Sequence, residues 1–405
     1  MTETALILGG GQAGAQGAAS LRQEGFGGRI LLVGEEPLPP YQRPPLSKAF
    51  LAGELAQERL LIKPETFYRQ HDIELLLGVK ATGLDTVARE LRLADGQPLP
   101  YDQLLLATGG RPRHLECPGA DHPRLRYLRT AADVEQLRPD FRPGARLVVI
   151  GAGYIGLEVA AVAAKHGLQV TVLEAAPRVL ARVAGTEISA FFERIHTEAG
   201  VAIHCNTGVT AIEGGSGLAL VRTSAGDLVA ADLVLAGIGL LPNVELAAAV
   251  GIACDNGILV DELGQTSVAG VFAAGDCTNH PNAIYGCRWR LESVHNAIEQ
   301  AKTAAATMAG KHKPYDQVPW FWSDQYDIKL QTAGINRGYD QAVVRGDPAT
   351  RSFAVFYLRN GRLLAVDAIN RPAEFIAARL AIPRAPQVDA ERLRDDGLSP
   401  QTLLA

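Results

Sequence analysis

Two groups of glycines have the spacing that binds a pyrophosphate. The first is Gly9-x-Gly11-x-x-Gly14, which follows the apolar stretch 5–8 and precedes a run of small residues. In this spacing the first glycine makes a tight turn, the second lets backbone approach phosphate, and the third packs a helix on a strand. The N-terminus of that helix attracts anions because its N–H groups are unpaired. The pattern therefore predicts a dinucleotide site.

The same pattern occurs a second time in the chain. The apolar residues 147–150 lead into Gly151-x-Gly153-x-x-Gly156, and Glu174 ends the next apolar stretch 18 residues later. Such an acid can accept the hydroxyls of a ribose. Two complete units indicate two dinucleotide sites rather than a chance arrangement of the 42 glycines.

The corresponding acid of the first unit is Glu35, 21 residues after Gly14. It has two interpretations: a ribose ligand, or an acid that only solvates a strand end. The proline-rich segment 37–48 follows, and it is too rich in proline to be a helix or a central strand before Leu46. This segment is either a stiff surface loop or a stretch laid along the cofactor, with Lys48 opening a helix.

Composition excludes several classes of function. A net charge of -5 argues against a general nucleic-acid binder. No run of 18 apolar residues lacks a charge or a glycine turn, and the start of the chain has no basic flank of a secretory signal, so we expect a cytoplasmic protein without a membrane span. The five cysteines form no C-x-x-C pair and the nine histidines have no metal-ligand spacing. We expect buried free thiols and no metal site.

The last third of the chain changes in character. The apolar stretch 266–276 predicts a strand that ends in an exposed acid, Asp276, at the edge where open α/β sheets bind ligands. A helix is predicted for 293–308. Beyond Pro314 the sequence predicts strands at 329–333, 341–345, 353–358 and 362–370 and a helix at 373–380, which indicates a small α+β domain.

Together these motifs resemble the flavoproteins of the glutathione-reductase fold. The segments 43–48 (RPPLSK), 292–294 (ESV) and 320–325 (WFWSDQ) resemble more specifically the ferredoxin reductases of bacterial oxygenase systems. The resemblance implies an α/β chain with two Rossmann-like dinucleotide-binding domains and a small C-terminal α+β domain. It implies an FAD domain formed by 1–112 and 244–319, an NAD domain at 113–243, and a C-terminal domain at 320–405.

The resemblance also implies which residues bind the two cofactors, FAD and NADH. For FAD they are Gly9, Gly11, Ala13, Gly14, Glu35, Arg43, Lys48, Val79, Ala107, Thr108, Arg111, Asp276 and Val294. For the nicotinamide dinucleotide they are Gly151, Gly153, Ile155, Gly156, Glu174, Arg182 and Gly239. The charge of Glu174 would disfavour the 2′-phosphate of NADPH, although Arg178 and Arg182 could soften that preference.

The implied activity is an NADH-dependent ferredoxin reductase. Hydride would pass from NADH to FAD, and single electrons would then pass to a [2Fe-2S] ferredoxin that feeds a monooxygenase or a ring-hydroxylating dioxygenase. Lys48 would stabilise the reduced flavin, and Glu158 resembles the carboxylate that meets this lysine in the family. The alternative for Glu158 is an acid on a helix surface. Disulfide reductases of this fold carry cysteines where this chain has Leu46-Ser47-Lys48.

Electron exit and partner docking are predicted at the C-terminal domain. Trp322, with Trp320, would lie near the flavin edge, and the alternative is that both tryptophans belong to a small core. A slight excess of positive charge in this region suits an acidic ferredoxin, with Lys302, Lys329, Arg337 and Arg379 as candidate docking cations. We expect a monomer or a weak dimer.

Two other functions remain open from the sequence. An NADH-dependent disulfide or peroxide reductase requires a thiol near the flavin, and only Cys277, beside Asp276, is a candidate. An NADH-sensing flavoprotein that acts as a binding module shares the fold and the lysine-glutamate pair.

Overall fold

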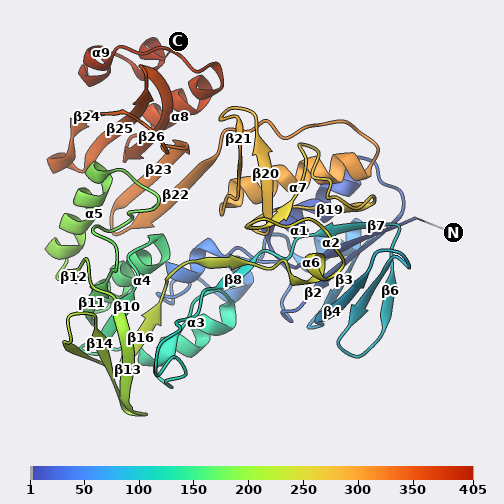
Figure 1. Cartoon of the computed structure of the whole chain (residues 1–405), viewed down its shortest axis with the longest axis horizontal. Helices are drawn as coiled ribbons and strands as arrows, with labels where there is room; N and C mark the ends of the chain where they lie inside the picture. The colour runs from blue at the N-terminus through green and yellow to red at the C-terminus, as the bar shows by residue number, and fades with distance from the viewer. Residues whose placement is uncertain (1–2, 405) are drawn as a thin grey trace. The chain divides into compact units, whose positions relative to one another are not determined.

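The structure is a computed structural model that describes residues 3–404, and it contains two compact units (Figure 1). The first unit is formed by the chain up to Gln42, by Gln57–Arg111 and by Leu241–Pro319. The second is formed by Arg43–Ala56, by Pro112–Leu240 and by the chain from Trp320 onward. The second unit does not separate an NAD domain from a C-terminal domain, so the three-domain division stays a prediction.

A parallel five-stranded sheet forms the centre of the first unit. Leu6 of its middle strand lies opposite Leu31 on one side and Leu104 on the other. All of its strands except the edge strand at Ile73–Leu77 are buried on both faces, which fits their nearly continuous apolar sequences. Two alanine-rich helices, α1 (Gln12–Gln23) and α7 (Val294–Met308), pack together over one face. The strand order is β19 (Val271–Ala273), β7 (Gln103–Leu106), β1 (Thr4–Leu8), β2 (Arg29–Gly34) and β3 (Ile73–Leu77).

Smaller elements complete the first unit. An antiparallel sheet packs with residues of the opposite face of the central sheet in a second apolar cluster. It consists of β4 (Ala81–Asp85), β5 (Glu90–Leu93) and β6 (Pro98–Pro100). A separate small sheet is formed by β18 (Ile258–Leu259), β20 (Thr278–Asn282) and β21 (Cys287–Trp289). The short helices are η2 (Gln57–Leu60), α2 (Glu65–Gln70) and α6 (Glu245–Ala249), and β8 (Gly110–Pro112) and β17 (Leu240–Pro242) lie where the chain passes between the units.

The second unit repeats the architecture of the first. Its parallel sheet has the order β12 (Ala202–His204), β11 (Gln169–Leu173), β10 (Arg146–Ile150), β16 (Leu233–Ala236) and β9 (Leu125–Arg126). The helices of this part are η1 (Pro44–Ser47), α3 (Ala131–Leu137), η3 (Arg138–Asp140), α4 (Tyr154–Lys165) and α5 (Thr186–Glu198), and an antiparallel sheet is formed by β13 (Val209–Gly215), β14 (Leu218–Thr223) and β15 (Leu228–Ala231).

A second, antiparallel five-stranded sheet also belongs to this unit. Its order is β22 (Trp320–Gln325), β23 (Ile328–Gly334), β26 (Arg362–Ile369), β25 (Ser352–Arg359) and β24 (Gln341–Asp347). The helices α8 (Pro372–Ala381), α9 (Ala390–Arg394) and α10 (Pro400–Leu403) and the turns η4 (Pro348–Thr350) and η5 (Ile382–Arg384) accompany it. The predicted mixed α/β fold is confirmed, whereas β22 was not predicted as a strand.

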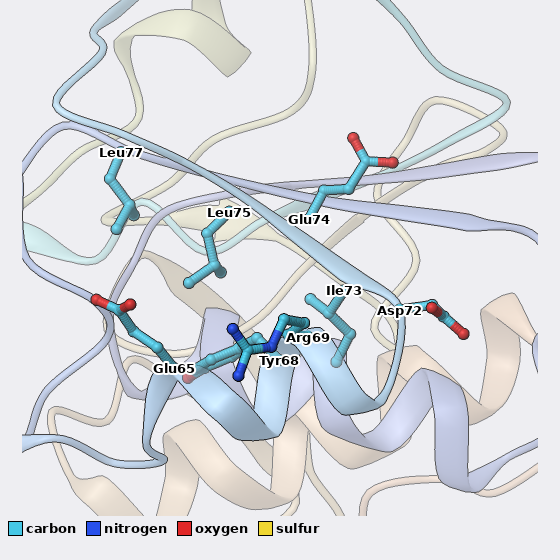
Figure 2. Close-up of a pocket in the computed structure, with 8 residues that line it drawn as sticks. All are labelled: Glu65, Tyr68, Arg69, Asp72, Ile73, Glu74, Leu75 and Leu77. Carbon is cyan, nitrogen blue, oxygen red and sulfur yellow. The ribbon is translucent and has the colours of Figure 1, made fainter.

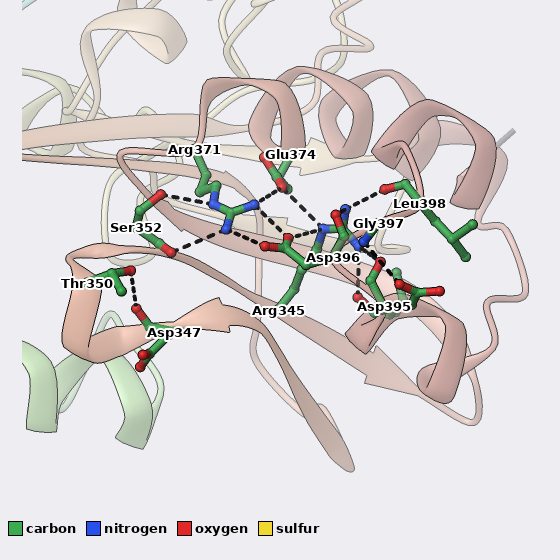
Figure 3. Close-up of polar contacts among 11 residues, drawn as sticks. Arg345, Asp347, Thr350, Ser352, Arg371, Glu374, Asp395, Asp396, Gly397 and Leu398 are labelled. Carbon is green, nitrogen blue, oxygen red and sulfur yellow. Dashed lines mark hydrogen bonds and ion pairs between the residues drawn. The ribbon is translucent and has the colours of Figure 1, made fainter.

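The end of the chain is fastened to this sheet by a buried arginine (Figure 3). The guanidinium of Arg345 on β24 is only 2% exposed and donates to the carbonyl oxygens of Leu393, Asp395 and Leu398. Glu374 of α8 accepts from it at 3.2 Å. Burying a charge is costly unless it is fully bonded, so these contacts hold residues 393–398 firmly on the sheet.

Three local expectations were wrong. Lys48 ends a 3-10 helix instead of opening a helix, because the turn already begins at Pro44, four residues earlier. The strand before Asp276 stops at Ala273, and Asp276 is half-buried rather than exposed. Of the five free cysteines only Cys277 is buried, and Cys287 is exposed.

No helix among residues 3–404 has the length and apolar content to cross a membrane.

Candidate functional site

The first glycine turn is shaped for a close approach of backbone and ligand. Gly9 has φ +124°, and a Cβ placed there would lie 2.2 Å from the carbonyl oxygen of Ala107. A Cβ on Gly14 would lie 1.9 Å from the oxygen of Gly9. A Cβ on Gly11, the N-cap of α1, meets no atom within 4 Å, so open space lies in front of the helix N-terminus. This cradle fits a pyrophosphate.

Other predicted FAD residues of the first unit gather around this turn. Ala13 at the start of α1 lies 3.0 Å from a Cβ placed on Gly275, so the turn that carries Asp276 packs against the helix that begins at the phosphate cradle. Val294 begins α7, which packs on α1. Glu35 follows the end of β2, is exposed, and pairs with Lys80 at 3.1 Å. The backbone N–H of Val79, beside Lys80, donates to the oxygen of Gly34.

Two side chains that sequence reasoning missed support these residues. The side-chain amide of Asn243 donates to Thr108 O at 2.9 Å and accepts from Arg111 at 2.9 Å, and the Thr108 hydroxyl donates to the backbone oxygen of Asn243 at 2.7 Å. Gln300 of α7 accepts from the N–H of Gly275 at 2.8 Å and from Thr278 Oγ1 at 2.7 Å. Both side chains bond to residues that are far away in the sequence, so no local sequence motif predicts these contacts.

The second glycine turn repeats the geometry with one difference. Gly151 has φ +99°, and its Cβ would lie 2.6 Å from the oxygen of Gly237. Gly153 faces open space as Gly11 does. Here, however, the acid is bonded to its own turn, because Glu174 accepts from the N–H of Ala152 at 2.6 Å and from that of Ala176 at 2.8 Å.

The remaining predicted residues of this site lie at the same edge of the sheet. Ile155, on the first turn of α4, is 46% exposed, and a Cβ on Gly156 would lie 2.2 Å from the oxygen of Gly151. The guanidinium of Arg182 lies 3.4 Å from a Cβ placed on Gly239. Arg178 instead donates to Ala184 O of its own loop at 2.9 Å and to Ser189 of α5, so its guanidinium is engaged within the protein.

The most specific feature of the second unit is a buried ion pair. Lys48 Nζ lies 2.7 Å from Glu158 Oε2, and the Glu158 side chain is only 4% exposed. Ser47 and Ser323 donate hydroxyl hydrogens to the same carboxylate, Ser323 at 2.6 Å. The interpretation of Glu158 as an acid on a helix surface is therefore wrong. Lys48 also donates to Pro44 O at 3.2 Å, which leaves one of its three ammonium protons for a ligand among the contacts of the described residues.

Arg43 and the tryptophans also belong to the second unit. Arg43 donates to the carbonyl oxygen of Arg129 at 2.6 Å. Trp320 packs edge-on against Phe375 of α8 at 5.6 Å, so this ring belongs to the core of the C-terminal sheet. Trp322 lies 5.5 Å from the Trp320 ring, is half-buried and is exposed in part to solvent.

The one buried thiol is not poised to react. Cys277 is fully buried and donates to the carbonyl oxygens of Ala274 and Leu106 at 3.4 and 3.6 Å. Burial raises the pKa of this thiol above its usual value. Since the thiolate is the nucleophile, Cys277 has the properties of a structural cysteine.

A surface hollow of the first unit lies apart from these residues (Figure 2). It is lined by α2 and β3, including Tyr68, Arg69 and Leu75, and it contains none of the predicted site residues. Within residues 3–404 no group of three His, Cys, Asp or Glu side chains has the arrangement of a metal site.

Comparisons with known proteins give a consistent result over the whole chain. Residues 4–301 match the family described as pyridine nucleotide-disulphide oxidoreductase, and residues 320–404 match the reductase C-terminal family. Rhodocoxin reductase of Rhodococcus erythropolis is 46% identical over 92% of this chain and 88% of its own length. Putidaredoxin reductase of Pseudomonas putida is 44% identical over 100% of this chain and 97% of its own. The crystal structure of a covalent putidaredoxin reductase–putidaredoxin complex matches with a TM-score of 0.95 and 43% identity, covering 99% of this chain and 98% of that chain.

Proposed function

The chain belongs to the pyridine nucleotide-disulphide oxidoreductase family, and from this premise we propose that it is an FAD-dependent, NADH-dependent ferredoxin reductase. FAD, when bound, would supply hydride acceptance from NADH and single-electron transfer to a [2Fe-2S] ferredoxin. That ferredoxin would feed a monooxygenase or a ring-hydroxylating dioxygenase. A cytoplasmic location and a monomeric or weakly dimeric state are part of the proposal.

One observation favours the proposed activity over the disulfide reductase activity found in the same fold. The segment that ends in Ser47 and Lys48 offers a hydroxyl and an ammonium group to Glu158, where a disulfide reductase needs a thiol. In this proposal Lys48 holds a positive charge for the flavin half of FAD, and Glu158 holds Lys48. The buried Cys277 gives the disulfide or peroxide alternative no support.

The cofactor assignments follow the two glycine turns. The cradle of Gly9, Gly11 and Gly14 takes the pyrophosphate of FAD, with Glu35 toward the ribose. The cradle of Gly151, Gly153 and Gly156 takes NADH. Glu174, fixed by two backbone N–H groups, repels a 2′-phosphate and so favours NADH over NADPH.

Ferredoxin would dock on the C-terminal sheet near Trp322. On α8, Ile376 and Leu380 are 52% and 70% exposed, and Arg379 lies over the Trp320 ring at 5.5 Å. Exposed apolar residues beside a cation suit an acidic partner that also buries apolar surface. Lys302 and Lys329 are weaker docking candidates because they pair with Glu299 and Asp324.

The experiment mixes the purified, FAD-loaded protein with NADH and candidate two-iron ferredoxins, and compares the turnover with NADPH and with disulfide substrates. We expect rapid ferredoxin reduction with NADH. Turnover only with disulfides, or a protein that retains no flavin after reconstitution, would contradict the proposal.

A further inference from the structure

Strand β22 of the second unit has two faces with different contacts. Its side chains alternate, as in any strand, so that Phe321, Ser323 and Gln325 share one face. Ser323 and Gln325 are both at most 1% exposed. Phe321 stacks against Tyr154 of α4 at 4.5 Å, which places this face against the helix that carries Glu158.

An unbroken chain of hydrogen bonds runs from Glu158 along this face. Ser323 Oγ donates to Glu158 Oε1 at 2.6 Å, and Gln325 Nε2 donates to Ser323 Oγ at 3.2 Å. Gln325 Oε1 lies 2.8 Å from His196 Nε2, and His196 Nδ1 lies 3.0 Å from the hydroxyl of Tyr326. His196 is fully buried on α5, so water does not reach the middle of the chain.

The donor and the acceptor in each of these hydrogen bonds follow from the Glu158 carboxylate, at which the series begins. An ionised carboxylate only accepts, so the Ser323 hydroxyl must donate to Glu158 and accept from the amide of Gln325. The carbonyl end of that amide then faces His196, which must carry its hydrogen on Nε2. Nδ1 is left to accept from the hydroxyl of Tyr326. The pair of Lys48 and Glu158 thus determines which tautomer of a distant histidine fits.

Two further features keep the chain in this arrangement. Tyr326 has φ +56° in the two-residue turn between β22 and β23, a conformation that costs free energy for a non-glycine residue and is kept only where the surroundings favour it. Burial lowers the pKa of His196 to about 4, so the ring stays neutral and Nδ1 stays an acceptor at ordinary pH.

We infer that Ser323, Gln325 and His196 are positioning residues that hold the Glu158 carboxylate in the orientation in which it pairs with Lys48. The inference rests on the proposed function, in which Lys48 serves the flavin. Ser47 bonds the same oxygen that Lys48 uses, whereas Ser323 bonds the other oxygen. Ser323 therefore fixes the rotation of the carboxylate about its last bond, and Gln325 and His196 fix Ser323.

The test measures single-turnover flavin reduction by NADH in the variants Ser323→Ala and Gln325→Met. Each removes one link with little change in size. We expect the rate to fall about tenfold, as for the loss of one hydrogen bond to a charged group, while the Kd for NADH changes less than about twofold. The matched control is Asp324→Asn on the opposite face of β22, which should react at the wild-type rate. A wild-type rate in Ser323→Ala overturns the inference.

A second readout needs neither NADH nor ferredoxin. Nitrogen-15 NMR of histidine-labelled protein should identify His196 as the Nε2–H tautomer in the wild type, and Gln325→Met should abolish that preference. An Nδ1–H tautomer in the wild type overturns the inference. A protein that gives the expected tautomer and flavin rates but reduces no ferredoxin would instead contradict the proposed function. Thermal unfolding of each variant separates a loss of fold from a loss of positioning, and Ser323→Ala decides the test if Gln325→Met does not fold.

Discussion

The two glycine turns are built alike, but their acids are held differently. Glu35 is exposed after its strand and pairs on the surface with Lys80, whereas Glu174 accepts two backbone N–H groups, one of them from the glycine turn itself. A carboxylate with an open side is free to accept ribose hydroxyls. A carboxylate locked to its turn is a fixed negative charge. The same motif therefore yields one site suited to retaining a cofactor and one suited to discriminating between two.

The largest effect should come from the turns themselves. We expect Gly9→Ala to lose at least about 3 kcal/mol of unfolding free energy and all FAD, because its Cβ meets the oxygen of Ala107 at 2.2 Å and φ is +124°. Gly151→Ala should retain FAD but lose reduction by NADH. Flavin absorbance and stopped-flow reduction measure both, and Gly27→Ala, which meets no atom within 4 Å, is the control. Loss of FAD in Gly151→Ala would mean that the two sites are not separate.

The discrimination that we propose for Glu174 predicts a change of specificity when this residue is substituted. Two charges about 4 Å apart repel by roughly 4 kcal/mol at an effective dielectric near 20, and half of that exceeds a factor of ten. Glu174→Gln should therefore raise kcat/KM for NADPH relative to NADH by more than about tenfold. Glu35→Gln should leave this ratio unchanged and weaken FAD retention, measured by ultrafiltration. An unchanged ratio in Glu174→Gln would remove the distinction between the acids.

The comparison also indicates how much of the molecule could be predicted from its sequence. The glycine turns were predictable because their function depends on the local order of Gly, strand and helix. The contact between Lys48 and Glu158 was expected only through the resemblance. Asn243 and His196 form hydrogen bonds with residues more than a hundred positions away in the sequence, and Gln300 of α7 bonds to the turn at Gly275. Sequence periodicity does not predict such partners. Lys48 lies at the end of its helix rather than at the start, because proline is favourable at the first helical position and Pro44 therefore begins the turn.

The second unit should respond to pH through a buried carboxyl. Asp367 on β26 accepts from Thr332 and Tyr357 at 2.6 and 2.7 Å, and burial raises its pKa to about 6. The folded protein then binds this proton more tightly than the unfolded chain does, so stability falls as pH rises from about 4 to about 6 and stays lower above it. The shift corresponds to about 3 kcal/mol, so we expect Asp367→Asn to raise the free energy of unfolding by up to about that amount at pH 8 and to change nothing at pH 3.5.

Thermal melts that follow flavin release and tryptophan fluorescence separately should assign this gain to the second unit, since two of the three tryptophans, Trp320 and Trp322, lie there. An equal gain at pH 3.5 would show that ionisation of Asp367 is not the cause.

The smallest effect is expected at the surface partner of the first acid. Lys80 and Glu35 are 63% and 66% exposed, and such pairs contribute little. Lys80→Met should change stability by less than about 0.5 kcal/mol and leave FAD affinity within about twofold. A larger loss of FAD, measured by titration of the apoprotein, would mean that Glu35 depends on its partner as Glu174 depends on its turn.

The contacts of the buried Arg345 on β24 have a practical consequence for shortening the protein. Arg345 donates to the peptide carbonyls of Leu393, Asp395 and Leu398, and it also pairs with the carboxylates of Glu374 and Asp396. Substitutions of Leu393, Asp395 or Leu398 keep these carbonyls, whereas a substitution of Asp396 removes a carboxylate that pairs with Arg345 and Arg371. A stop codon before residue 393 would leave the buried guanidinium without its carbonyl acceptors. Deletions that begin after Leu398 remove none of these carbonyls, which makes that boundary the natural place to attach a reporter or an electron-carrier fusion.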